Sequence, residues 1–189
     1  MSSDRASALA RRFGTSRGLV RLLLAHGQTA LGAAKIVAPA PETVRRLVFV
    51  CQGNICRSAF AEAVARRRGI ACCSFGLSTT SGIGAHPPAI EAADRFGVDL
   101  RPHRTTRCED YAPRPGDLLL AMEVRQLHRL AADPRLAALP RSLLGLWATP
   151  RRPHLHDPYS LSDAYMRTCL ELVDSAVAAL ESAFPKARA

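Results

Sequence analysis

Residues 46–63, RLVFVCQGNICRSAFAEA, decide the fold of this chain. They begin with the apolar run 46–51, which predicts a buried strand, and residues 58–68 have the composition of a helix that ends at Gly69. The loop between them therefore connects the end of a strand to the start of a helix. Backbone N–H groups in such a loop point toward the positive end of the helix dipole, so the sequence predicts an anion site there.

Side chains in this loop predict a nucleophile aimed at phosphorus. Cys51 lies at the base of the positive cup, which favours its thiolate. Arg57 lies six residues further on, where its fork can hold two oxygens of a phosphoryl group, and Ser58 can donate to the departing thiolate. Gly53 and Asn54 tolerate the backbone of a tight loop. A lone buried cysteine is usually a small core residue, but its place between strand and helix favours the catalytic interpretation.

The rest of the chain alternates predicted strands and helices. Further strands are predicted at residues 70–75, 117–122 and 142–146, and further helices at residues 87–96, 123–132 and 161–183. This alternation predicts an α/β fold in three layers, a four-stranded parallel sheet with helices on both faces. Ligands bind such sheets at the carboxyl ends of the strands, which is where the cysteine loop lies.

The motif VFVCQGNICRSAFAEA resembles the signature of the low-molecular-weight protein tyrosine phosphatases, V-C-x-G-N-I-C-R-S-P-x-A-E. The similarity extends over residues 46–183 and includes SFGLST, HPPAIEAADRFGVDL, DLLLAMEVRQL, LLGLW and HDPYS. The Glu after the Met and the Leu-Gly-x-Trp run look most like the bacterial members paired with exopolysaccharide tyrosine autokinases. The resemblance implies a phosphatase that hydrolyses phosphotyrosine through a cysteinyl-phosphate intermediate, with no metal and no cofactor.

The resemblance also assigns roles outside the nucleophile. Asp157, which precedes a proline, matches the general acid that protonates the tyrosyl oxygen and then activates water, although an Asp-Pro pair alone is more typical of a turn. Tyr159 matches the residue that walls the slot for an aryl phosphate. The positions that match phosphate-binding residues are Gln52, Gly53, Asn54, Ile55, Cys56 and Ser58.

A second group of matches supports the phosphate loop. Glu62, Ser74 and His103 match residues that form a hydrogen-bond network with Asn54. Their ordinary interpretations are a solvated helix carboxylate, a turn serine and a surface histidine. Cys56 matches a cysteine that can pair with the nucleophile on oxidation, and its ordinary interpretation is packing.

The chain departs from the family pattern in a few places. Ala59 stands where proline is usual, and Thr106 stands where arginine is usual, with Arg107 next to it as a replacement that the sequence leaves open. Gln52 occupies a substrate-facing position that is often apolar. These differences concern substrate preference rather than the chemistry.

The N-terminus differs in charge from the rest of the 189 residues. Residues 1–46 hold eight basic and two acidic residues, so they supply much of the formal net charge of +10. We expect a basic N-terminal extension, residues 1–43, partly helical or disordered, before a phosphatase domain, residues 44–185. A helix is predicted over residues 16–37, with little order before it. That helix either packs on the domain, which we favour, or contacts an anionic membrane surface.

Composition argues against several classes of protein. The six cysteines indicate reduced thiols and a cytoplasmic location, since a core this large needs no disulfide framework. The mildly basic domain lacks the aromatic and arginine surface typical of nucleic-acid binding. His154 and His156 could face one metal ion, but the spacing places no third ligand.

Three alternatives share the fold or the anion loop. An arsenate reductase needs two relay cysteines on a mobile segment, whereas Cys72 and Cys73 are adjacent in a predicted strand. Arginine phosphatases tend to carry threonine at the position of Ile55. A non-catalytic phosphotyrosine-binding module would have lost one of the three catalytic residues, all of which are present. The expected partner is therefore a phosphotyrosyl protein, such as a bacterial tyrosine autokinase.

Overall fold

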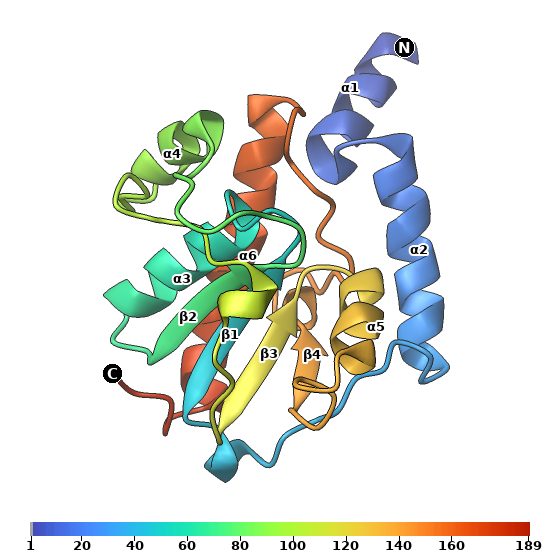
Figure 1. Cartoon of the computed structure of the whole chain (residues 1–189). Helices are drawn as coiled ribbons and strands as arrows, with labels where there is room; N and C mark the ends of the chain where they lie inside the picture. The colour runs from blue at the N-terminus through green and yellow to red at the C-terminus, as the bar shows by residue number, and fades with distance from the viewer. Residues whose placement is uncertain (1) are drawn as a thin grey trace.

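The computed structural model describes residues 2–189, with side chains from residue 8 on (Figure 1). Its strands are β1 (Arg46–Cys51), β2 (Cys72–Gly76), β3 (Asp117–Ala121) and β4 (Arg141–Leu143). Its helices are α1 (Ser2–Phe13), α2 (Ser16–Ala30), α3 (Arg57–Arg67), α4 (Pro87–Asp94), α5 (Val124–Ala132) and α6 (Asp163–Ala183). Short 3-10 helices lie at Pro41–Thr43, Cys108–Asp110 and Leu144–Leu146.

The four strands form one parallel sheet in the order β2-β1-β3-β4, as predicted. The strands are almost wholly buried, which suits a parallel sheet covered on both faces. The chain moves from β1 outward to β2 and then crosses back to β3, so the strand order reverses beside β1. In such folds the crevice beyond the carboxyl ends at this switch point is the ligand site. Cys51 ends β1 at that crevice.

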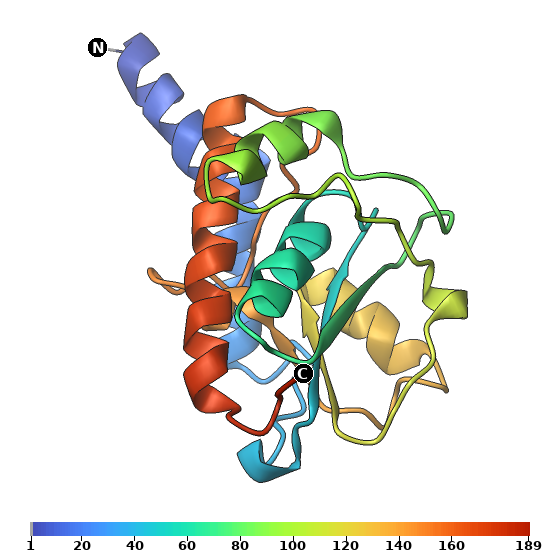
Figure 2. The same ribbon diagram turned by 90° about the vertical axis from the view of Figure 1, so that its left-hand side faces the viewer.

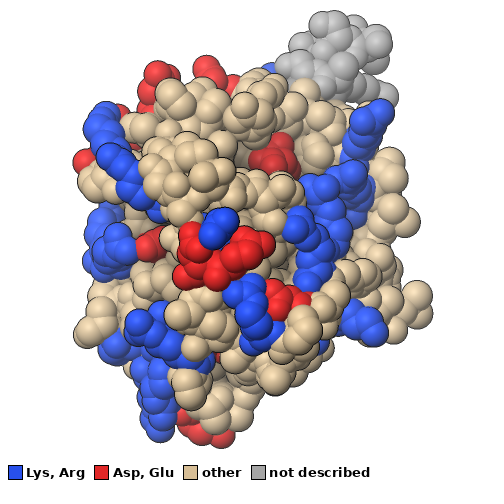
Figure 3. Space-filling model, viewed as in Figure 1, with Lys and Arg blue, Asp and Glu red and all other residues tan. Residues whose placement is uncertain are grey.

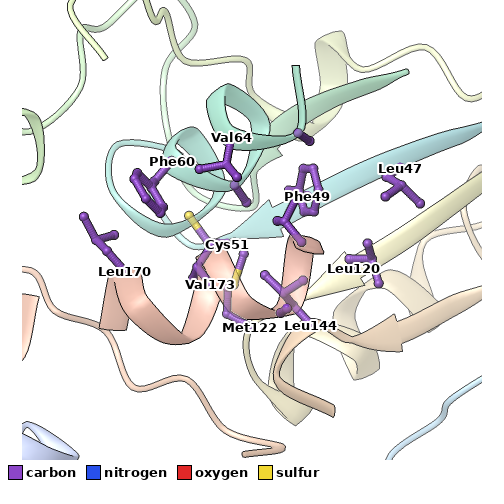
Figure 4. Packing of buried hydrophobic residues seen from close by; sticks show 14 of the residues in the cluster. Leu47, Phe49, Cys51, Phe60, Val64, Leu120, Met122, Leu144, Leu170 and Val173 are labelled. Carbon is purple, nitrogen blue, oxygen red and sulfur yellow. The ribbon is translucent and has the colours of Figure 1, made fainter. Parts of the chain in front are cut away.

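Helices cover both faces of the sheet, which confirms the predicted three layers. The helices α3 and α6 pack on one face and α5 packs on the other (Figure 2). Leu47 and Phe49 of β1 face the first side, where they pack with Phe60 of α3 and Val173 of α6 (Figure 4). The β1 residues between them face α5, because successive side chains of a strand point to opposite faces.

β4 is shorter than the predicted strand at residues 142–146. It ends at Leu143, and the next three residues form a 3-10 helix. The chain turns there because it lies directly against residue 152. The N–H of Arg152 donates to the Gly145 carbonyl at 2.7 Å, and a Cβ on Gly145 would lie only 1.8 Å from the Arg152 carbonyl oxygen. This approach holds the segment before Asp157 against the sheet.

Two helices precede the sheet. The prediction of little order before residue 16 is wrong for α1, whose alanines and arginines are good helix formers, and α2 ends at Ala30 rather than at residue 37. The Thr15 hydroxyl caps α2 by accepting a hydrogen bond from the N–H of Gly18 at 3.0 Å. Leu22 and Ala25 are buried, so α2 packs on the domain. Across the described residues, no helix has both the length and the apolar character to cross a membrane.

After α2 the chain runs back along β4, the edge strand of the sheet. Val37 and Arg141 exchange two backbone hydrogen bonds of 2.9 Å in an antiparallel bridge. The Arg141 side chain also donates from Nε to the Lys35 carbonyl at 2.9 Å. The segment before β1 is therefore joined to the sheet by backbone as well as by side chains.

Candidate active site

Cys51 lies at the base of the loop that connects β1 to α3. Its Sγ accepts a hydrogen bond from the N–H of Asn54 at 3.1 Å and lies 3.0 Å from the Oγ of Ser58. Both groups can donate to a thiolate, the form in which a cysteine acts as a nucleophile. Ser58 thus lies where the sequence places a donor to the thiolate, and the N–H of Asn54 is a second donor that the sequence did not reveal.

Asn54 holds the loop in its bent form. Its φ angle is 56°, in the left-handed region that asparagine tolerates better than most residues, and its side chain is fully buried. The side-chain amide donates to the Oγ of Ser58 at 2.8 Å and to the Oγ of Ser74 at 2.7 Å. Its Oδ1 accepts from the N–H of Thr106 at 2.8 Å. Asn54 thus joins the loop to β2 and to the segment after α4.

The predicted support residues complete this network. Ser74 donates to the carboxylate of Glu62 at 2.6 Å, and His103 Nε2 lies 2.8 Å from the Asn54 carbonyl oxygen. Burial lowers the pKa of His103, so the neutral ring donates this hydrogen bond near pH 7. Glu62, Ser74 and His103 come from three separate parts of the chain. Ser74 and His103 contact Asn54 directly, and Glu62 is joined to it through Ser74.

Arg57 opens α3 with its side chain 1% exposed. Its Nη1 donates to Glu123 at 3.0 Å and to the Leu155 carbonyl at 2.8 Å. Its Nη2 lies 2.6 Å from the carboxylate of Asp157. Its Nε is buried and has no hydrogen-bond partner among the described residues. The guanidinium is thus fixed on one edge and free to bind an anion through Nε.

Glu123 is a site residue that the sequence analysis missed. Its buried carboxylate also accepts from Arg125 Nε at 2.8 Å. Burial opposes ionisation, but the charge of Arg57 and the hydrogen bond from Arg125 outweigh it and lower the pKa of Glu123 to about 2. A signal was present, because Glu123 follows directly on the carboxyl end of a predicted strand, beside the switch point. Its role is to orient Arg57.

A cavity of about 200 Å³ opens above the sulfur. The residues that line it come from the nucleophile loop and from the segment that carries Asp157. They are Cys51, Gln52, Gly53, Ile55, Cys56, Arg57, Asp157 and Tyr159. The Tyr159 ring stands at the rim, with its centroid 4.8 Å from that of His86, a contact that the sequence did not reveal. Of the predicted phosphate-binding residues, Asn54 and Ser58 do not line this cavity, and the others do.

Other predicted features stand around this cavity. Cys56 is buried at the start of α3, and burial raises the pKa of its thiol well above the usual range. Its redox role stays a prediction. Arg107 pairs with Asp110 at 3.0 Å, lies exposed and does not line the cavity. Ala59 is buried within α3, which begins at Arg57 without the usual proline.

His154 and His156 lie side by side in the loop that carries Asp157. His154 Nε2 is 3.5 Å from His156 Nδ1, and His154 Nδ1 is 3.9 Å from Glu123. Burial lowers the pKa of His154 to about 4, so its ring is neutral at pH 7. Within the part of the chain whose side chains are described, no group of three or more His, Cys, Asp or Glu residues is placed to hold a metal ion.

Comparison with known proteins agrees with this geometry. The family described as low molecular weight phosphotyrosine protein phosphatase matches residues 46–189, and the chain belongs to it. The probable low molecular weight protein-tyrosine-phosphatase EpsP of Ralstonia solanacearum is 33% identical over 91 residues, which are 47% of this chain and 63% of that protein.

Two solved structures share the fold. The tyrosine phosphatase AmsI of Erwinia amylovora matches with a TM-score of 0.63 and 26% identity, over 75% of this chain and 93% of that one. The tyrosine phosphatase Wzb of Escherichia coli K30, in complex with sulphate, matches with a TM-score of 0.62 and 28% identity, over 71% of this chain and 94% of that one. The predicted fold and the predicted family are confirmed.

Replacing Glu123 with glutamine is expected to lower the free energy of unfolding at neutral pH by roughly 3 kcal/mol, because the buried charge of Arg57 loses its carboxylate. The pKa of Glu123 lies below its ordinary value of 4.5 in the folded chain, at about 2. Its ionised form therefore stabilises the fold above about pH 4.5, and this contribution is lost as the pH falls toward 2. Urea unfolding at neutral pH and near pH 3 measures both effects.

Glu91→Gln is the matched control, since Glu91 is an exposed carboxylate of α4. It should change stability by less than about 0.5 kcal/mol at either pH. The loss in Glu123→Gln should be smaller at the acid pH. A loss of equal size at both pH values would show that the ionised carboxylate does not stabilise Arg57.

Proposed function

We propose that the protein is a protein tyrosine phosphatase that hydrolyses phosphotyrosine through a cysteinyl-phosphate intermediate. The observation that carries the proposal is the convergence of Cys51, Arg57 and Asp157 on one cavity, with two hydrogen-bond donors on the sulfur. The unpartnered Nε of Arg57 is a donor that a phosphoryl oxygen would satisfy. The similar structure of Wzb was determined in complex with sulphate, which is a tetrahedral anion like phosphate.

In the first step the thiolate of Cys51 attacks phosphorus, and the bond between phosphorus and the tyrosyl oxygen breaks. Asp157 gives its proton to that oxygen, so tyrosine leaves as a neutral phenol. Arg57 holds the equatorial oxygens, which carry the charge of the transition state. The phosphoryl dianion takes the place at Nη2 that the Asp157 carboxylate occupies, 2.6 Å away, in the structure.

In the second step water attacks the phosphorus of the cysteinyl-phosphate. Asp157, now ionised, takes a proton from that water, and the bond between phosphorus and sulfur breaks. Ser58 lies 3.0 Å from Sγ, so its hydroxyl stabilises the thiolate that leaves. Inorganic phosphate then dissociates. No step of this sequence requires a metal ion.

The substrate and location belong to the same proposal. The resemblance to bacterial members paired with exopolysaccharide systems supports a phosphotyrosyl protein as the substrate, such as the tail of a tyrosine autokinase. Tyr159 and Ile55 give the cavity an aromatic and an aliphatic wall, which suit a phenyl ring. All six cysteines are free, which accords with a cytoplasmic location.

Wild-type protein with EDTA present should hydrolyse a phosphotyrosyl peptide faster than a phosphoarginyl peptide, and should not reduce arsenate with a thiol. Asp157→Asn should lower kcat on the phosphotyrosyl peptide by on the order of 10²–10⁴-fold, because asparagine has no proton to give. Inhibition by inorganic phosphate should not weaken in this variant, since a carboxylate that competes for Arg57 is removed.

Steady-state kinetics on the three substrates test the proposal. Absence of wild-type turnover under reducing conditions would overturn it in favour of a binding module. Preference for phosphoarginine, or arsenate reduction, would keep the fold and change the reaction. An Asp157→Asn variant as active as wild type would remove Asp157 from the role of general acid.

A further inference from the structure

The two helices before the family region touch the segment that carries Asp157. Arg152 donates from Nη1 to the Arg12 carbonyl at 2.6 Å, and its guanidinium lies 5.0 Å from the centre of the Phe13 ring. Thr15 Oγ1 and His156 Nε2 share a hydrogen bond of 3.1 Å, across 141 positions of sequence. The last turn of α1 and the cap of α2 therefore both contact the acid loop, residues 148–160.

The contact is too close for side chains at two positions. Gly14 has a φ angle of 77°, and a Cβ there would lie 2.8 Å from the Tyr165 ring. A Cβ on Gly18 would lie 3.0 Å from the His156 ring and 2.1 Å from the Phe13 carbonyl oxygen. Both glycines thus permit the helices to approach the loop as closely as they do.

The contact lies next to the reacting groups. His156 directly precedes Asp157, and its carbonyl accepts a hydrogen bond from the Tyr165 hydroxyl at 3.2 Å. The backbone before Asp157 is thus held by α6 on one side, while the His156 ring meets the N-terminal helices on the other. The Asp157 carboxylate contacts Arg57 Nη2 in this structure, at the place that a phosphoryl group would take. When phosphate occupies that place, the support of the backbone before Asp157 remains to position the carboxyl group.

The helix α2 also contacts Glu123, the residue that orients Arg57. Arg21 of α2 lies 3.7 Å from the Glu123 carboxylate. Basic side chains gather along the edge of the molecule where α2 lies (Figure 3). A cavity of about 340 Å³ lies between α2 and α5 at this point. Two functional groups, the acid and the phosphate-binding arginine, therefore have partners that contact the N-terminal helices.

We propose that residues 2–30 are a positioning element of the active site, which holds the general-acid loop over the phosphate cup through Thr15, Gly18 and the Arg12 carbonyl. The proposal rests on the proposed phosphatase function. None of these residues touches the substrate. Their effect passes through His156 and Arg152 to the position of Asp157.

Substrates with different leaving groups distinguish this positioning role from a general effect on the stability of the fold. A tyrosyl oxygen, with a phenol pKa near 10, needs a proton from Asp157 as it leaves. A dinitrophenolate is a stable anion and leaves without one. Displacement of Asp157 by about 1 Å should therefore lower kcat/KM, which reports only the first step, strongly for phosphotyrosine and little for dinitrophenyl phosphate.

Gly18→Ala tests the proposal, with Gly27→Ala as the matched control. Both substitutions replace a glycine of α2 with alanine, a better helix former, but nothing lies within 4 Å of a Cβ on Gly27. In Gly18→Ala, kcat/KM for phosphotyrosine should fall by roughly tenfold relative to kcat/KM for dinitrophenyl phosphate. In Gly27→Ala this ratio should equal that of wild type.

Thr15→Val and Thr15→Ser give a second, independent comparison. Valine removes the hydroxyl that contacts His156 and caps α2, whereas serine keeps it, so the ratio of kcat/KM values should shift in the first variant and recover in the second. In an Asp157→Asn background Gly18→Ala should have no further effect on the ratio. Circular dichroism confirms that each full-length variant is folded.

The outcomes separate the two proposals. If wild type hydrolyses both esters but every variant keeps the wild-type ratio, the positioning role is overturned and the phosphatase stands. An equal fall of kcat/KM for both esters in Gly18→Ala also overturns it, because that result indicates a structural effect alone. If wild type hydrolyses neither ester, the phosphatase proposal is overturned, and the positioning role, which rests on it, is overturned as well.

Discussion

Cys51→Ser is expected to abolish turnover, with kcat lower by at least on the order of 10⁴-fold. Serine fits the space, because Sγ already lies among small partners at hydrogen-bond distance. Its hydroxyl, however, is not ionised near pH 7, and Asp157 serves the leaving group rather than the nucleophile. The fold and the anion cup should persist, so the variant should still bind a phosphotyrosyl peptide. Steady-state kinetics and calorimetric titration measure the two properties.

Cys73→Ser is the matched control, since Cys73 is a half-buried cysteine of β2 outside the cavity. It should keep kcat within about threefold of wild type. Rapid quenching of wild-type turnover, followed by mass spectrometry, should find one phosphoryl group on the peptide that contains Cys51. Phosphorylation of another residue, or full activity in Cys51→Ser, would refute the cysteinyl-phosphate mechanism.

Arg57→Lys should cause the second-largest loss, with kcat/KM lower by on the order of 10³-fold. An ammonium group keeps the charge but not the planar fork, so it cannot hold two phosphoryl oxygens while it bonds to Glu123 and the Leu155 carbonyl. Lysine also leaves acceptors in the buried site without donors. We therefore expect the free energy of unfolding to fall by roughly 2–3 kcal/mol.

Arg125→Lys provides the comparison for this prediction. Arg125 bonds to the same Glu123 carboxylate, but its side chain is 52% exposed and it does not line the phosphate cavity. This variant should keep kcat/KM within about threefold of wild type and lose less than about 1 kcal/mol. Similar losses in both variants would show that Arg57 acts only through the charge network and not on phosphate.

The nucleophile loop could be predicted because its signals are local. An apolar strand, a glycine and an asparagine, and a helix follow one another in residues 46–68, and Asn54 has the positive φ angle that its side chain tolerates. The parallel sheet follows from the alternation of strands and helices. The polar residues of the supporting network could be named only by resemblance, since nothing local ties Ser74 to Glu62.

The contacts that sequence reasoning missed are long-range ones. Arg57 and Glu123 are 66 positions apart in the sequence. Only the packed fold shows that Glu123, just after β3, contacts Arg57, just after β1. The helix α1 was missed for a related reason. Its sequence has few apolar residues to mark a buried face, and its contacts with the acid loop run largely through the Arg12 carbonyl and glycine backbone.

The bridge between Val37 and Arg141 also bears on how the molecule meets other copies of itself. An open edge strand presents unpaired N–H and C=O groups that can recruit a strand from another chain. Here the chain's own returning segment pairs with the first residue of that edge, Arg141, whose side chain also binds the Lys35 carbonyl. A shortened chain that began at β1 would expose this template for intermolecular strand pairing. The N-terminal segment thus contributes to solubility as well as to shape.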